Sequence, residues 1–198
     1  LAVQLNPIII YRSVKALPWF WRDRVIFSRK LSADDWPQHL YPILLDRNAQ
    51  SANLGEYFWQ DLYVAKRIIE ANPDRHIDIG SRVDGFIAHL ACVRSVEIFD
   101  IRPLTAKIDN VTFHQWDLTE PSIVNVGIAD CVSCLHTLEH VGLGRYGDPL
   151  DPDGWKKALA SLAGLVKSGG GLWLSVPIGF QRVEFNAHRI FAPMTIRD

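Results

Sequence analysis

The sequence has 198 residues, of which 48% are hydrophobic, so it can bury one substantial core and predicts one domain with an extension rather than two full domains. Its net charge of -1 gives no basic field of the kind that draws proteins to nucleic acid or anionic membranes, and no apolar run approaches the roughly twenty residues of a membrane span. With three cysteines and no visible signal peptide, we expect a cytoplasmic protein without a nucleic-acid partner or a membrane span.

Residues 1–50 form an N-terminal extension that is rich in aromatic side chains and interrupted by proline, as in the run Leu17-Pro18-Trp19-Phe20-Trp21. The prolines are expected to prevent a long helix and to favour extended or turn conformations. So many large apolar side chains predict that the extension packs on the main domain. The sequence leaves two interpretations open, because the extension could be a substrate wall or simply an apolar cover over a sheet edge.

Residues 51–198 predict an α/β domain in which strands alternate with helices. Residues 55–71 have the pattern of an amphipathic helix, with an apolar face expected to point inward. That face consists of Leu54, Phe58, Leu62, Ala65 and Ile69. Strands are expected at 75–79, 95–99, 111–115, 128–135 and 171–176, and further helices at 84–93 and 154–167, the last one stopped by the glycines at 169–171. This order implies a Rossmann-like, mostly parallel sheet with helices on both faces.

The stretch from Arg75 to Asp100 organises the domain. It reads as a short strand that stops at Gly80, a sharp turn into a helix, and a second strand that ends in an acid. Asp100 lies about twenty residues beyond Gly80, the separation at which a carboxylate at the tip of the second strand can hydrogen-bond a ribose. The sequence therefore predicts an adenosyl-type ligand above Gly80 and beside Asp100.

With these elements in order, residues 52–180 resemble the class I S-adenosylmethionine-dependent methyltransferases, and in detail an uncharacterised bacterial branch. The resemblance rests on Asp78-Ile79-Gly80, Asp100, Asp117, and the segments 138–141 and 165–171. It implies S-adenosylmethionine as cofactor, with Gly80 under the methionine part, Asp100 on the ribose hydroxyls and Asp117 facing the adenine. The implied cofactor-binding residues are Asp78, Gly80, Ser81, Arg82, Asp100, Asp117 and Leu118. Trp116 and Leu118 could sandwich the adenine.

One departure from the superfamily's pattern concerns its glycine-rich turn. This chain has Arg82 and Asp84 where later glycines are usual, and side chains there either narrow the pocket or become part of it. Arg82 could pair with the cofactor's carboxylate. Alternatively, Arg82 could point to solvent or pair with Asp84, and Asp84 could act only as a helix N-cap. The sequence fits both interpretations.

The segment His136-Thr137-Leu138-Glu139-His140 follows the fourth expected strand. It matches a zinc-protease pattern that requires both histidines on one helical face, but here it follows an apolar strand, so no metal site is predicted. At the carboxyl end of a strand, His136, Glu139 or His140 could accept a proton from an acceptor hydroxyl. Alternatively, Glu139 and His140 only cap the loop backbone.

Two smaller features complete the expectations. Cys131 and Cys134 are three residues apart in a strand, so their thiols should point to opposite faces as buried structural residues. The superfamily's closing hairpin normally follows the fifth strand, but the remaining residues could supply at most one further strand, around 182–185. We therefore expect an incomplete hairpin and an exposed sheet edge. The chain begins without Met and stops abruptly, which is typical of a fragment.

The function expected from this resemblance is methyl transfer from S-adenosylmethionine to a small-molecule or carbohydrate acceptor. The carbohydrate suggestion rests on the resemblance alone, since relatives of this branch accompany surface-polysaccharide genes. The alternative is a non-catalytic binding or scaffold module with a degenerate cofactor loop. We expect Gly80, Asp100, Asp117 and residues 135–136 to gather at one edge of the sheet. The sequence carries no signal for the oligomeric state.

Overall fold

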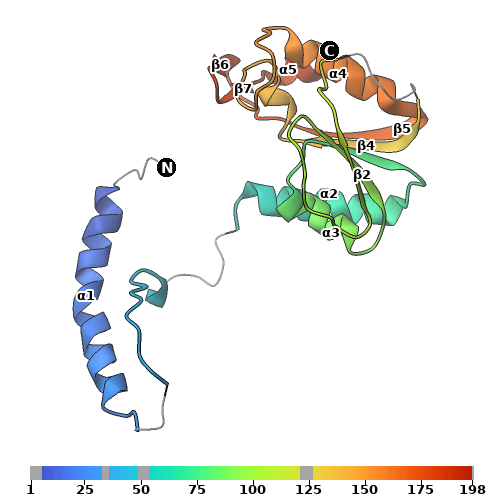
Figure 1. The fold of residues 1–198 in the computed structure, drawn as a ribbon. Coiled ribbons are helices and arrows are strands. Elements are labelled where there is room, and N and C mark those ends of the chain that lie inside the picture. The colour runs from blue at the N-terminus through green and yellow to red at the C-terminus, as the bar shows by residue number, and fades with distance from the viewer. Residues whose placement is uncertain (1–5, 33–35, 49–53, 121–126, 198) are drawn as a thin grey trace. The chain divides into compact units, whose positions relative to one another are not determined.

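The computed structural model describes residues 6–32, 36–48, 54–120 and 127–197 (Figure 1). The chain divides into two compact units, Leu1–Leu54 and Gly55–Asp198. In the described parts of the chain, none of the helices combines the length and the apolar character that a bilayer crossing needs.

The first unit contains a long helix, α1 (Pro7–Ser28), and a 3₁₀ turn, η1 (Asp46–Asn48). The expectation that the prolines prevent a long helix is therefore wrong. Pro7 occupies the start of α1, where its missing N–H would have no helical partner, and the Asn6 side chain caps the Ile8 N–H at 2.9 Å. Pro18 lies inside the helix, where it removes one backbone hydrogen bond, and the turns on both sides persist. Packing of this unit on the second one stays a prediction.

The second unit is built on a five-stranded parallel sheet with the order β3-β2-β1-β4-β5, which confirms the predicted fold class. The strands are β1 (His76–Ile79), β2 (Val96–Asp100), β3 (Val111–Gln115), β4 (Ala129–Leu135) and β5 (Val166–Ser175). The strand order reverses between β1 and β4. In doubly wound sheets, the crevice outside the carboxyl ends of the strands at this reversal is where ligands bind.

Helices cover both faces of the sheet (Figure 1). Helices α2 (Glu56–Ala71) and α3 (Ala88–Ala91) lie on one face, and α4 (Gly154–Leu165) and α5 (Pro193–Arg197) lie on the other. A π-helical turn, η2 (Val83–Ile87), leads into α3, and a 3₁₀ turn, η3 (Leu138–His140), follows β4. Cys131 packs in the core beneath α2 and Cys134 in the core beneath α4, so the prediction that these buried thiols face opposite sides is confirmed.

Helix α2 ends where the sequence predicts, but its buried face differs from the expected one. The buried residues are Asp61, Val64, Ala65 and Ile68, and of the predicted set only Ala65 is among them. The helix carries large apolar side chains around most of its circumference, so periodicity alone does not single out the face that packs. The true face also includes a carboxylate, which a hydrophobic pattern counts as solvent-facing.

The glycines at 169–171 do not stop α4 as predicted. Helix α4 ends at Leu165, and β5 begins at once and runs through these glycines, beside an irregularity in its pairing with β4. Gly169 has φ of +82°, and a Cβ on Gly170 would lie 2.9 Å from the Asp130 carbonyl oxygen. The glycines therefore allow β5 to pass close to β4, which is a bulge role rather than a capping role.

The C-terminal residues form two short strands, where the sequence suggested at most one. Strands β6 (Arg182–Glu184) and β7 (His188–Ile190) make an antiparallel hairpin of their own. Among the described residues this hairpin does not join the main sheet, so β5 is an outer strand, as expected for an incomplete closing hairpin. Arg189 of β7 is buried and donates to the carbonyl oxygens of Val141 and Pro152, which fastens the hairpin to the loop after η3.

Candidate functional site

Two adjoining hollows open at the carboxyl ends of the strands. The inner hollow is lined by residues that follow β1, β2, β3 and β4, including Gly80, Asp100, Asp117 and His136. The outer cleft has a volume of about 800 Å³, which falls within the range of small-molecule pockets. Both hollows share the side chains or backbone of Gly80, Asp100, Arg102, His136, His140 and Tyr146. The residues expected at one edge of the sheet therefore lie there together.

The turn after β1 depends on Gly80. Its φ of +68° is in the left-handed region, and a Cβ at this position would lie 2.6 Å from Cγ2 of Thr137. Beneath the turn, the fully buried Asp78 accepts hydrogen bonds from the Ser81 backbone N–H at 3.1 Å and the Ser81 hydroxyl at 2.7 Å. Asp78 lines neither hollow, so it positions the turn from below, whereas Ser81 lines the outer cleft.

Asp78 is also one end of a buried polar chain. The Ser133 hydroxyl donates to Asp78 Oδ2 at 2.5 Å, and His76 Nε2 lies 2.8 Å from the same hydroxyl oxygen, so His76 is the donor to it. Burial raises the pKa of Asp78 to about 7, against the lowering effect of the hydrogen bonds from Ser133 and Ser81. Burial, with a contribution from Arg94, lowers the pKa of His76 to about 3. The histidine is therefore neutral at physiological pH.

Asp100 lies at the tip of β2, where a guanidinium already engages it. Arg102 donates to Oδ1 from its backbone N–H at 2.8 Å and from Nε at 3.1 Å, and to Oδ2 from Nη2 at 2.8 Å. This fork fixes the carboxylate but leaves acceptor capacity on Oδ2. The Arg102 guanidinium lies 4.4 Å from the centre of the Tyr146 ring. Sequence reasoning missed Arg102, although its position two residues beyond the acid was a usable signal.

Asp117 and its neighbours form the far wall of the inner hollow. The Asp117 Oδ1 atom accepts from the Thr119 N–H at 2.8 Å and from the Thr119 hydroxyl at 2.7 Å. Trp116 and Leu118, on either side, are both buried, and the Trp116 ring meets Phe99 edge to face at 5.8 Å. The wall is therefore apolar, with one carboxylate at its margin.

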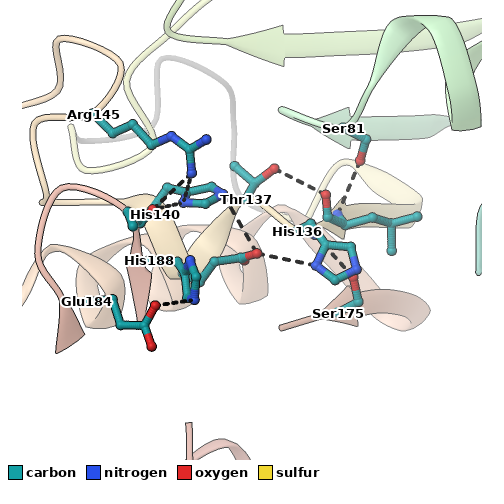
Figure 2. Close-up of polar contacts among 11 residues, drawn as sticks. Ser81, His136, Thr137, His140, Arg145, Ser175, Glu184 and His188 are labelled. Carbon is teal, nitrogen blue, oxygen red and sulfur yellow. Dashed lines mark hydrogen bonds and ion pairs between the residues drawn. The ribbon is translucent and has the colours of Figure 1, made fainter. Parts of the chain in front are cut away.

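His136 is held in an unusual conformation directly after β4. Its φ of +54° is in the left-handed region that non-glycine residues seldom occupy, and such strain is concentrated at functional sites. Hydrogen bonds from its backbone N–H to the carbonyl oxygen and hydroxyl of Ser175, at 3.2 Å and 3.1 Å, keep it there. Its ring packs against Tyr57 of α2, with centroids 4.4 Å apart. Figure 2 shows the contact of His136 to Ser175.

Glu139 lies under both histidines of the segment. Only 1% of this residue is exposed, and its Oε1 atom is 3.3 Å from Nδ1 of His136 and 3.8 Å from Nε2 of His140. One buried carboxylate thus orients two imidazoles. The segment forms a 3₁₀ turn, and the described residues contain no group of three or more His, Cys, Asp or Glu placed to hold a metal ion.

The C-terminal hairpin contributes His188 to the lining of the outer cleft, and Figure 2 shows this residue beside His140 and Arg145. The Ala187 carbonyl oxygen lies 2.6 Å from Nδ1 of His140 and accepts from Nη1 of Arg145 at 3.0 Å. The His188 ring lies 6.4 Å from that of His140. Burial lowers the pKa of His140, against the opposing charge of Glu139. Arg145 and His188 were missed by sequence reasoning, since neither lies near the recognised strand ends in the sequence.

Arg82 takes the more ordinary of its two expected roles. Its Nε and Nη2 atoms each donate to Asp84 at 3.2 Å, and both residues are exposed. Asp84 makes no capping hydrogen bond, so the interpretation of Asp84 as an N-cap is wrong; Arg82 itself occupies the N-cap position of η2. The turn lies close to α2, because a Cβ at Gly85 would come within 2.6 Å of Oδ2 of Asp61.

Asp61 of α2 is a second site residue that the sequence pattern missed. Only 6% of it is exposed, and it lines the outer cleft together with Ser81 and Arg82. Burial raises the pKa of Asp61, partly offset by the charge of Arg82. A buried carboxylate beside the β1 turn gives this end of the cleft a group suited to a cationic ligand.

Comparisons with known proteins agree with this architecture. Residues 106–197 match a family described as Caenorhabditis protein of unknown function, DUF268. A comparison with curated proteins gives no match. Among solved structures, an O-methyltransferase family protein from Burkholderia thailandensis aligns with a TM-score of 0.50 and 18% identity, over 69% of this chain and 47% of that one. This chain therefore spans about half the length of that protein.

Two further structures have lower similarity. A 1,6-didemethyltoxoflavin-N1-methyltransferase from Burkholderia thailandensis aligns with a TM-score of 0.46 and 16% identity, over 69% of this chain and 63% of that one. An amino pentose methyltransferase from Micromonospora echinaspora aligns with a TM-score of 0.44 and 19% identity, over 69% of this chain and 57% of that one. Together with the sheet order, the first alignment decides the fold. The second unit has the class I methyltransferase fold.

Proposed function

We propose that this domain binds S-adenosylmethionine across the two adjoining hollows, with its adenosine part at the inner hollow, and transfers its methyl group to a small-molecule acceptor in the outer cleft. The observation that carries the proposal is the convergence of Gly80, Asp100 and Asp117 on one hollow, each from the end of a different strand of a doubly wound sheet. Such a crevice at the reversal of strand order is where nucleotide-like ligands bind.

Each part of the cofactor has a matching group. Asp100 Oδ2 retains an acceptor for the ribose hydroxyls, and the apolar wall of Trp116 and Leu118 suits the adenine, with Asp117 facing its amino group. The methionine end would lie over Gly80, with Ser81 and Arg82 beside it and the buried Asp61 available for its ammonium. When bound, the cofactor supplies an electrophilic methyl group on sulfur.

The acceptor's proton would go to His136. If Nδ1–H of His136 donates to Glu139, which lies 3.3 Å away, Nε2 is left as the proton acceptor. Glu139 would then act as a positioning residue. His140 would hold the turn that carries His136 and Glu139 against the hairpin, through its hydrogen bond to the Ala187 carbonyl oxygen. Alignment of the acceptor with the methyl group can supply much of the rate by itself.

The acceptor class and the location of the protein belong to the same proposal. A carbohydrate acceptor and a bacterial surface-polysaccharide context are implied by the sequence resemblance, and the outer cleft of about 800 Å³ has room for a sugar-sized molecule. A cytoplasmic location is supported by Cys92, Cys131 and Cys134, which are free thiols in the structure.

One observation favours a second candidate, a binding module without methyl transfer. Arg102 already occupies three of the acceptor positions of Asp100, so a ligand must share this carboxylate with a guanidinium. In a scaffold, that ion pair would be permanent, and the inner hollow would not take up the cofactor.

We expect Asp100→Ala to weaken the binding of S-adenosylhomocysteine about ten- to hundredfold in titration calorimetry. Charge-assisted hydrogen bonds to the ribose hydroxyls are worth roughly 1.5–3 kcal/mol, which corresponds to that factor. Asp109→Ala removes an exposed acid that lines no hollow and serves as the matched control. Wild-type protein that fails to bind at millimolar ligand would favour the scaffold, and unchanged affinity of Asp100→Ala would remove the ribose assignment.

A second variant tests the departure in the glycine-rich turn. Since Arg82 pairs with the exposed Asp84, Arg82→Gly is expected to change the affinity for S-adenosylhomocysteine less than about threefold, the range of an exposed ion pair. The same titration measures it. A much tighter complex would mean that Arg82 obstructs the pocket. A much weaker complex would mean that Arg82 exchanges its pairing with Asp84 for a pairing with the cofactor's carboxylate.

A further inference from the structure

Arg145 is a cation at the acceptor side of the outer cleft whose charge is not balanced by a carboxylate. The neighbouring arginines of the cleft are neutralised, since Arg82 pairs with Asp84 and Arg102 with Asp100. Within the described part of the chain, Arg145 forms no ion pair with an acid, and it donates a hydrogen bond to the Ala187 carbonyl oxygen beside His140. An unpaired guanidinium in a cleft is a site for an anionic ligand.

The guanidinium is fixed along one edge. Nη1 donates to the Ala187 carbonyl oxygen at 3.0 Å. It lies 3.3 Å from Nδ1 of His140 (Figure 2), and the guanidinium lies 5.1 Å from the centre of the Tyr146 ring. Arg189 anchors the hairpin that carries Ala187. Only the Nη1 edge has these protein partners among the described residues, so the Nη2 and Nε donors remain for a ligand.

The acids around Arg145 do not cancel its charge. Glu184 is paired with Arg182 at 2.8 Å, and Glu139 is buried between His136 and His140. Asp148 accepts hydrogen bonds from the backbone N–H groups of Gly142, Gly144 and Tyr146, which hold its carboxylate in the loop. The imidazole of His188 lines the same cleft, and its Nε2 atom lies 3.3 Å from Oε2 of Glu184, so this ring is already held by an acid.

We propose that Arg145 is an oxyanion subsite and that the molecule bound in the outer cleft carries a carboxylate or phosphate group. This inference rests on the proposed function, because it assigns the acceptor side of the same site. The guanidinium fork matches the two oxygens of either anion, whereas a neutral sugar would leave the fork unused. The acceptor would then be anchored by its anion at Arg145, and its nucleophile would face His136.

The test measures the binding of two anionic probes and one neutral probe. Glucuronate and glucose 1-phosphate, with glucose as the neutral reference, are titrated into wild-type protein at constant ionic strength, with and without S-adenosylhomocysteine. We expect at least one anion to bind more tightly than glucose, and the anion that binds identifies the source of the charge. Arg145→Gln should weaken that binding about tenfold or more, and Arg145→Lys, which keeps the charge but not the fork, should weaken it less.

Arg67→Gln is the matched control. Arg67 is exposed, lies 5.3 Å from the centre of the Tyr63 ring and lines neither hollow, so its loss changes the net charge equally but should leave anion binding unchanged. The proposal is overturned if neither anion binds wild-type protein better than glucose, if Arg145→Gln binds as wild type does, or if Arg67→Gln weakens binding equally. If S-adenosylhomocysteine does not bind, the proposed function is overturned. The anion titrations made without it still test whether Arg145 binds an anion.

Discussion

Gly142→Ala is expected to destabilise the methyltransferase-like domain by about 2–5 kcal/mol. Gly142 has φ of +81°, where a Cβ costs roughly 1–2 kcal/mol, and that Cβ would overlap the backbone carbonyl of Asp151. Overpacking against a rigid partner adds typically about 1–3 kcal/mol. Thermal denaturation measures the loss, since each kcal/mol corresponds to roughly 2–4 °C in a chain of this size.

Gly147→Ala separates the two causes. Gly147 belongs to the same loop and has φ of +87°, but a Cβ there would meet no atom within 4 Å. We expect this variant to lose only the stability that a Cβ costs in the left-handed backbone conformation, roughly 1–2 kcal/mol. Equal losses in the two variants would contradict the overlap with Asp151. Because the loop carries Arg145 and Tyr146, Gly142→Ala should also weaken anion binding in the outer cleft.

The second large effect concerns the dependence of stability on pH. We expect His76→Phe to become less stable relative to wild type as the pH rises between about 4.5 and 6.5, and Asp78→Asn to become more stable over the same interval. Each difference should change by about 1.4 kcal/mol per pH unit, so the two variants diverge in opposite directions. Urea denaturation across this interval measures both.

The signs follow from which state holds the proton. Burial keeps the pKa of His76 at about 3 in the folded protein, against 6.5 unfolded, so between these values the unfolded chain binds the extra proton and stability rises with pH. Burial raises the pKa of Asp78 from 3.8 to about 7, so the folded protein holds the extra proton and stability falls as the pH rises. In wild type the two slopes oppose each other. If the free energy of unfolding changed with pH in the same way for wild type and both variants, the pKa values of His76 and Asp78 would not be shifted as described.

The amino-acid sequence by itself determined the strands β1 to β4 and the residues at their carboxyl ends. Short apolar runs separated by helical or crossover-length segments fixed a parallel sheet, because such connections return each strand in the same direction. Once the sheet is parallel, Gly80, Asp100 and Asp117 must meet at one edge, since each follows a strand that ends there. These features depend on local pattern and chain direction, which a sequence contains directly.

Only the tertiary structure decided which side chains share the site. The position of Arg145 beside Ala187 of the hairpin and the burial of Asp61 on α2 depend on packing between elements distant in sequence. Local propensities are weak compared with packing, so the buried face of α2 was set by the folded chain and not by periodicity.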